Sequence, residues 1–276
     1  MGCAALSCLA LAQSAAPAAP TTPATSATTA TPATLRVYSA GSLKAAWTEL
    51  AQAYQARTGT RIEFEFGASG LLRERLVKGE AADLFTSADT GHPRALADAG
   101  LALPMRPFAG NRLCALAQPE AGISSANLLE RLLDPAVKVG SSTPRADPSG
   151  DYTWAMFERA GKVKPGAFET LSTKALQLVG GPNSAPTPPG RTAYGALMER
   201  HAADVFLTYC TNAVLAQREL PKLVVVQLPP ALAVTATYGM AQLRAARPGA
   251  AALADYLLSP EGQQILARQG FSPPPP

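Results

Sequence analysis

The sequence predicts an α/β protein with two lobes, each a mostly parallel sheet flanked by helices. Strand-like apolar segments alternate with amphipathic helical segments from residue 35, and the alternation begins again after residue 119. The chain has 276 residues, of which 47% are apolar, and can therefore bury a core in each lobe.

The first run of elements has the order β-α-β-α-β. Apolar residues recur at steps of three and four from Leu43 to Tyr54, which predicts a helix that ends at Gly59. The other expected elements are strands at 35–40, 61–69 and 82–89 and a helix at 70–79. Strands joined by helices in this order predict a parallel sheet covered by helices.

The second run has its own apolar periodicity and predicts a second lobe. The expected elements are helices at 125–134, 150–160, 167–179, 192–202 and 211–219 and strands at 137–142, 204–210 and 222–229. A loop rich in Pro and Gly at 180–191 interrupts this run, and an amphipathic helical region at 249–271 closes the chain.

The two ends of the chain differ in composition from the rest. Residues 1–16 join an apolar run to small residues, which is typical of a secretory signal peptide cleaved after Ala12 or Ala16. No Lys or Arg precedes the run, so a plain apolar tail is the alternative. Residues 17–34 contain only Pro, Ala, Thr and Ser and predict a disordered linker, and residues 273–276 predict a disordered tail.

Charge and hydropathy exclude two classes of function. The formal net charge of +4 is small and dispersed, which argues against nucleic-acid binding and mildly favours an anionic ligand. No stretch after the first residues reaches the roughly 18 apolar residues of a membrane span. We expect a protein that acts outside the cytoplasm without crossing a membrane.

The cysteines and histidines do not predict a metal site or an enzyme. Removal of the signal peptide leaves Cys114 and Cys210, either as a disulfide or as two buried thiols. The histidines are His92 and His201, and neither has the spacing of a metal ligand. Cys210 and His201 are a catalytic pair by residue type alone, without any nucleophile or phosphate-loop motif, so we expect no catalysis and no cofactor.

Three serines stand where an expected helix begins after a strand or loop: Ser42, Ser69 and Ser149. Each alone is explained by capping of the helix N-terminus. As a set they favour a ligand, because the strand-to-helix turns of a parallel sheet meet at one edge. Helix N-termini there present free N–H groups and a partial positive charge to an anion.

Two further residues are candidates for the same site. Tyr209 ends the expected strand at 204–210, where its hydroxyl could donate to a ligand or lie at the rim of the core. Arg191 opens the helix after the Pro-rich loop, where its guanidinium could pair with an anion or point into solvent.

These turns resemble those of the periplasmic molybdate-binding proteins of ABC transporters, a family of extracytoplasmic solute-binding proteins. The resemblance is carried by "VYSAGSLKAAWTELAQAYQARTG", "FEFGASGLLRERLVKGEAADLFTSAD", "AGNRLCALAQP", "DPSGDYTWAMFERAG", "DVFLTYCTNAV" and "ADYLLSPEGQQILARQGF". It covers nearly all of residues 35–272.

The resemblance implies the type II periplasmic binding protein fold, with a ligand cleft between its lobes. Lobe I would comprise residues 35–108 plus 235–272, and lobe II residues 109–234. It also implies a periplasmic monomer that closes on molybdate or tungstate and delivers it to a permease in the inner membrane. The alternative is another anion, such as sulfate, phosphate or a small organic acid.

In that family the oxyanion accepts hydrogen bonds from two serine hydroxyls, from backbone N–H groups and from one tyrosine hydroxyl. Carried over by motif, the binding positions are Ser42 and Ser69 in the first lobe, Ser149 at a helix start in the second lobe, Tyr209, and a backbone donor near Arg191 or Thr192.

Overall fold

The computed structural model describes residues 1–2 and 34–274. The fold is that of residues 34–274, which belong to one compact unit. Nearly all of the expected signal peptide and linker lies outside the described residues, as do the last two residues of the expected tail.

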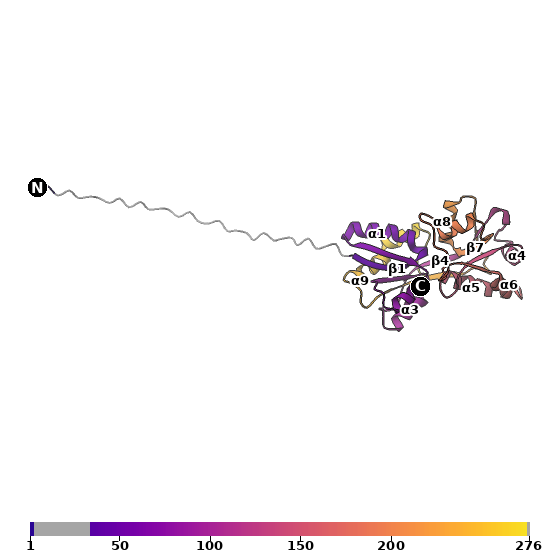
Figure 1. Cartoon of the computed structure of the whole chain (residues 1–276), viewed down its shortest axis with the longest axis horizontal. Helices are drawn as coiled ribbons and strands as arrows, with labels where there is room; N and C mark the ends of the chain where they lie inside the picture. The colour runs from indigo at the N-terminus through magenta and orange to yellow at the C-terminus, as the bar shows by residue number, and fades with distance from the viewer. Residues whose placement is uncertain (3–33, 275–276) are drawn as a thin grey trace. The chain divides into compact units, whose positions relative to one another are not determined.

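Nine strands form one curled, mixed sheet (Figure 1). The strands are β1 Thr34–Ala40, β2 Arg61–Gly67, β3 Leu84–Ser87, β4 Arg106–Ala117, β5 Val139–Ser142, β6 Leu176–Val179, β7 Val205–Tyr209, β8 Val224–Gln227 and β9 Thr235–Gln242. Their order across the sheet is β2-β1-β3-β9-β4-β7-β5-β6, and β8 pairs with β4.

Helices pack around both halves of this sheet. They are α1 Lys44–Thr58, which follows the 3₁₀ turn η1 Gly41–Leu43, then α2 Ser69–Val77, α3 Gly91–Asp98, α4 Leu128–Leu133 after the 3₁₀ turn η2 Pro119–Ala121, α5 Pro148–Val163, α6 Ala167–Lys174, α7 Ala193–Glu199, α8 Cys210–Glu219, α9 Ala250–Leu258 and α10 Pro260–Arg268. In Figure 1, α1, α3 and α9 lie around β1, and α4, α5, α6 and α8 lie around β7.

The long strand β4 belongs to both lobes. Its residues 106–112 pair antiparallel with β9, and its residues 113–117 pair antiparallel with β7 and β8. We call the part built on β1, β2, β3 and β9 the first lobe and the part built on β5, β6, β7 and β8 the second lobe. The lobe boundaries expected after residues 108 and 234 stay predictions.

Each lobe has its own apolar core. Trp47, fully buried, lies in the first-lobe core between α1 and the sheet, and its indole nitrogen donates to Thr86 at 3.1 Å. Phe157 is fully buried in the second-lobe core, where α5 packs on the other half of the sheet. The buried apolar residues that the structure describes form four clusters, two of them mainly in each lobe, so each run of apolar periodicity corresponds to a core in its own lobe.

Each lobe has parallel strands at its centre, as expected, since β1 pairs parallel with β2 and β3 and β5 pairs parallel with β6 and β7. The whole sheet is mixed, because β4 and β9 run antiparallel to the strands with which they pair. One expectation about the elements is wrong. Residues 176–179, expected at the end of a helix, form strand β6 instead, because α6 ends at Lys174 and the apolar residues that follow pair with β5 at the edge of the sheet.

Candidate functional site

A cleft of about 770 Å³ is lined by residues of both lobes. The starts of α1, α2, α5, α7 and α8 all contribute to its wall, through residues such as Ser42, Ser69, Asp147, Thr192 and Tyr209. The first N–H groups of a helix have no intrahelical partner and carry partial positive charge. The convergence of these helix starts makes the cleft attractive to an anion.

Five of the six predicted positions line the cleft, namely Ser42, Ser69, Arg191, Thr192 and Tyr209. Ser149 does not line it. Its backbone N–H donates to the Asp147 carboxylate at 3.0 Å, and its buried hydroxyl has no partner among the residues that the structure describes. At the start of α5, Asp147 is the residue that lines the cleft.

The serines of the first lobe do not cap their helices. The N-cap of α1 is Leu43 and that of α2 is Ala68, and neither makes a side-chain capping bond. Ser69 is the first residue of α2, and Ser42 lies within the turn η1. Capping therefore does not account for these two hydroxyls.

Ser69 is oriented by an N–H group of its own lobe. The N–H of Ala88 donates to the Ser69 hydroxyl oxygen at 3.2 Å, which leaves the hydroxyl proton free to donate to another acceptor. The carbonyl of Ala88 accepts from the Tyr209 hydroxyl at 3.3 Å. Ala88 thus links Ser69 in the first lobe to Tyr209 in the second.

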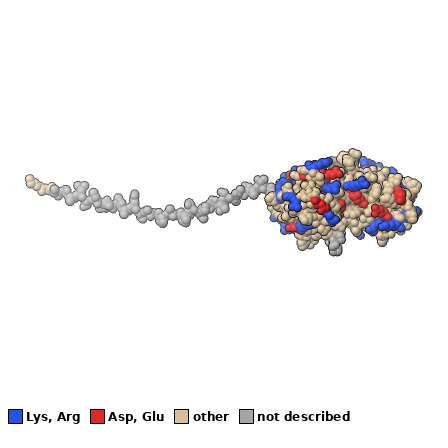
Figure 2. All heavy atoms as spheres, turned by 90° about the horizontal axis from the view of Figure 1, so that it is seen from below, with Lys and Arg blue, Asp and Glu red and all other residues tan. Residues whose placement is uncertain are grey.

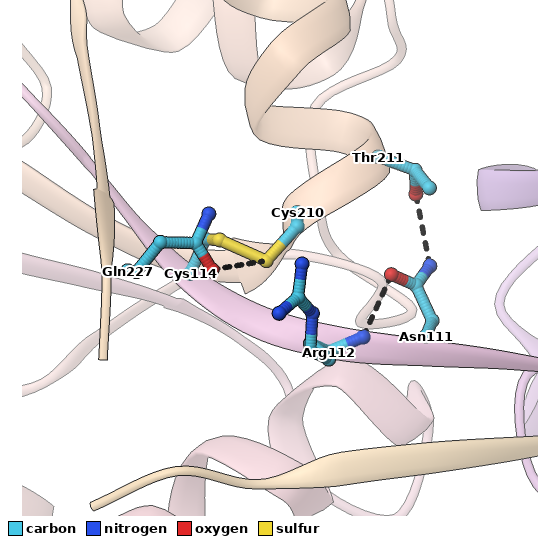
Figure 3. Close-up of a disulfide and its surroundings, with 6 residues drawn as sticks. All are labelled: Asn111, Arg112, Cys114, Cys210, Thr211 and Gln227. Atoms are coloured by element: carbon cyan, nitrogen blue, oxygen red, sulfur yellow. Dashed lines mark hydrogen bonds between the residues drawn. A yellow bond between two sulfur atoms is a disulfide. The ribbon is translucent and has the colours of Figure 1, made fainter. Parts of the chain in front are cut away.

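Ser42 is held by a second network, built on an amide. The N–H of Arg112 donates to Asn111 Oδ1 at 2.8 Å, which fixes the orientation of this amide (Figure 3). Asn111 Nδ2 then donates to Thr211 at 2.9 Å and to the Tyr238 hydroxyl at 3.3 Å.

The Tyr238 hydroxyl lies 2.9 Å from the Ser42 hydroxyl. Because Tyr238 already accepts from Asn111 and is fully buried, its proton is satisfied by donation to Ser42. Ser42 accepts that bond, so its own proton is free for an acceptor in the cleft. Both first-lobe serines are therefore arranged as donors.

Cys114 and Cys210 form a disulfide between β4 and the first residue of α8 (Figure 3). In the chain, Cys210 stands between Tyr209, which donates to the Ala88 carbonyl, and Thr211, which accepts from Asn111. The bridge therefore ties the chain at the point where the second lobe approaches both serines. Because its sulfur is in the bridge, Cys210 has no thiol for nucleophilic catalysis.

Carboxylates already occupy the donors of Arg191 and Thr192. The Arg191 guanidinium pairs with Glu199 at 2.9 Å and with Glu219 at 3.2 Å. The N–H of Thr192 donates to Glu219 at 2.6 Å, and its hydroxyl caps α7 by accepting from Gly195 at 2.9 Å. In the structure these two residues form part of the wall, where Arg191 Nε and Nη1 and the N–H of Thr192 donate to carboxylates of the protein.

Sequence reasoning did not select Asp147, Asn111 or Tyr238. The Asp-Pro pair before α5 is a helix-start signal that could have placed Asp147 at the cleft. Asn111 and Tyr238 lie in β4 and β9, whose strand character the apolar pattern did not identify.

The surface and the remaining polar residues add little to this site. On the face shown in Figure 2, basic and acidic residues are interspersed. No group of three or more His, Cys, Asp or Glu that could hold a metal ion occurs within the described ranges. Of the helices in residues 34–274, none is long and apolar enough to cross a membrane.

Comparison with known proteins identifies relatives over most of the chain. A family model described as "Bacterial extracellular solute-binding protein" matches residues 35–272. The uncharacterized protein PM1146 of Pasteurella multocida is 37% identical, over 87% of this chain and 98% of that protein. The molybdate-binding protein ModA of Mycobacterium tuberculosis is 28% identical, over 86% of this chain and 84% of that protein.

The fold is shared with solved structures at low sequence identity. The sulfate-binding protein SubI of Mycobacterium tuberculosis superposes with a TM-score of 0.70 at 17% identity, over 87% of each chain. The two-lobed arrangement is the type II periplasmic binding protein fold, as the sequence predicts.

Proposed function

Because the chain belongs to the bacterial extracellular solute-binding protein family, we propose that its cleft binds a tetrahedral oxyanion, molybdate or tungstate. Members of this kind in ABC importers deliver their ligand to a permease in the inner membrane. The observation that carries the proposal is the pair of first-lobe serines: Ser42 and Ser69 line the cleft, neither caps a helix, and each accepts a bond that leaves its own proton free.

These donors suit a ligand whose oxygens all accept. A fully deprotonated oxyanion has no proton to give, so every group that contacts it has to donate. Ser42, Ser69 and the first N–H groups of the surrounding helices are such donors. The Tyr209 hydroxyl joins them if it exchanges the Ala88 carbonyl, 3.3 Å away, for a ligand oxygen.

The sequence relatives support molybdate. A molybdate-binding protein is 28% identical over most of both chains. The sulfate-binding protein of the same fold supports only the fold, at 17% identity. Molybdate, tungstate and sulfate are all tetrahedral dianions with the same acceptor pattern, so the size of the closed cavity decides between them.

A bulkier anion is the second candidate, and the volume of the cleft favours it. A cleft of about 770 Å³ lies in the range of sites for drug-sized molecules. The exposed cations Lys44 and Arg200 also line it, one from each lobe. An oxyanion with an attached organic group would fill more of this cleft than a bare oxyanion and could pair with both cations.

Titration calorimetry of the mature protein with molybdate, tungstate, sulfate and phosphate tests the proposal. We expect heat from molybdate and tungstate, and a loss of about tenfold or more in affinity for Ser42→Ala and for Ser69→Ala, since a hydrogen bond to a charged group contributes about 1.5–3 kcal/mol. Ser125→Ala, at an exposed position outside the cleft lining, is the matched control and should keep its affinity. Absence of binding to all four anions would contradict the proposal.

A further inference from the structure

Asp147 brings a carboxyl group into a cleft whose other features favour an anion. It lines the cleft at the N-cap of α5, where its Oδ1 accepts from the N–H of Ser149 at 3.0 Å. An ionised carboxylate repels a bound dianion, so an anion could bind tightly beside Asp147 only if this carboxyl is neutral in the complex.

The position of Asp147 is next to the first-lobe donors. The N–H of Gly70, the residue after Ser69, donates to the carbonyl of Ala146, the residue before Asp147, at 2.9 Å. Ser69 and Asp147 thus flank one backbone hydrogen bond that joins the lobes. Burial is the main reason that the pKa of Tyr238, the partner of Ser42, is raised, and the negative charge of Asp147 adds a smaller increase.

The surroundings of Asp147 favour its neutral form. Burial raises the pKa of its carboxyl to about 6, and the hydrogen bonds from Ser149 and Ser142 offset this only in part. The titratable groups that face it are Asp151 on its own helix, Tyr194 at the start of α7, Tyr209 at the end of β7, and Tyr238 on β9. Among the described groups that act on this carboxyl there is no Lys or Arg.

We propose that the Asp147 carboxyl takes up one proton from solvent when the cleft binds a fully deprotonated oxyanion, and then donates that proton to a ligand oxygen. The inference rests on the proposed function, because it concerns the same anion. Uptake removes the charge that repels the ligand and adds a donor. Asp147 is thereby a specificity-determining residue whose protonation couples affinity to pH.

The alternative is that Asp147 only caps α5. Asparagine caps a helix as well as aspartate does, so Asp147→Asn keeps the cap and removes the titrating charge. The two roles therefore predict different results for one substitution.

Molybdate binding measured by calorimetry at pH 6, 7, 8 and 9 tests the proposal. With a carboxyl that titrates at about pH 6, the affinity of the wild type should fall up to about fiftyfold from pH 6 to pH 8. Asp147→Asn should bind with nearly constant affinity over this range and more tightly than the wild type at pH 8. Titrations of the wild type in two buffers of different ionisation enthalpy should show uptake of about one proton per molybdate at pH 8.

Asp151→Asn is the matched control, since it removes a carboxylate from the same helix outside the cleft lining and should keep the dependence on pH. Equal affinity of the wild type at pH 6 and pH 8, without proton uptake, overturns the inference and leaves the proposed function intact. Proton uptake by the wild type decides the question even if Asp147→Asn fails to fold. If the wild type binds none of molybdate, tungstate, sulfate and phosphate at any of these pH values, both the inference and the proposed function are overturned.

Discussion

Gly70 lies where the two lobes touch, and Gly70→Ala tests whether this contact is needed for binding. It is the second residue of α2, and its N–H donates to the Ala146 carbonyl at 2.9 Å. In an ordinary helix the change to alanine stabilises by about 1 kcal/mol. Here the added methyl group would meet the second lobe.

The structure sets the size of the effect. A Cβ on Gly70 would lie 2.5 Å from the Arg145 carbonyl oxygen and 2.7 Å from that of Ala146, whereas ordinary contact begins at 3.4 Å. The loop before α5 would therefore have to withdraw by about 0.7–0.9 Å, the differences between these distances. Such a shift breaks the bond to Ala146, which contributes about 0.5–1.5 kcal/mol, and separates Ser69 from the donors of the second lobe.

We expect Gly70→Ala to bind molybdate at least about tenfold more weakly, about 1.4 kcal/mol, with a free energy of unfolding within about 1 kcal/mol of the wild type. Calorimetry and urea unfolding measure the two quantities. Gly67→Ala is the control in the same turn, because the three atoms nearest to its added Cβ all belong to the side chain of Leu72 and lie at 3.4 Å or more, which is ordinary contact. Wild-type affinity in Gly70→Ala, or an equal loss in Gly67→Ala, would refute the reasoning.

Three further predictions concern stability and the second serine network. Replacement of Cys114 and Cys210 by serine should lower the free energy of unfolding in urea by up to about 4–5 kcal/mol, since the bridge spans 96 residues; a loss below about 1 kcal/mol would contradict this. Tyr238→Phe removes the donor to Ser42 and should weaken molybdate about fivefold to tenfold, with Ser42→Ala adding little in the same background. Burial alone raises the pKa of Asp83, but hydrogen bonds from a guanidinium and two backbone N–H groups bring it below its usual value. The stability that this carboxylate contributes is present above its unfolded pKa of about 4 and is lost as pH falls through the folded pKa. Between about pH 5 and pH 3, the free energy of unfolding measured in urea should therefore fall more steeply for the wild type than for Asp83→Asn, and equal slopes would contradict this.

Local patterns predicted the elements that carry strong periodicity. The helix from Lys44 to Thr58 and its end at Gly59 follow from apolar spacing and from a residue that adopts a left-handed φ of 71°. Strands β4 and β9 escaped the same reasoning, because β4 crosses from the first lobe to the second and β9 has a run of consecutive buried residues in place of a strict alternation. A single period does not describe such a strand.

The sequence by itself determined the α/β class, two apolar cores and a set of polar turns at the starts of helices, because these depend on spacing within a few residues. The tertiary structure alone decided what each polar group in those turns bonds to. Ser42 depends on Tyr238, almost two hundred residues away in the chain, and Arg191 Nε donates to Glu219. Whether a hydroxyl caps a helix or faces a ligand depends on which acceptor and donor fold beside it, and no local pattern contains that information.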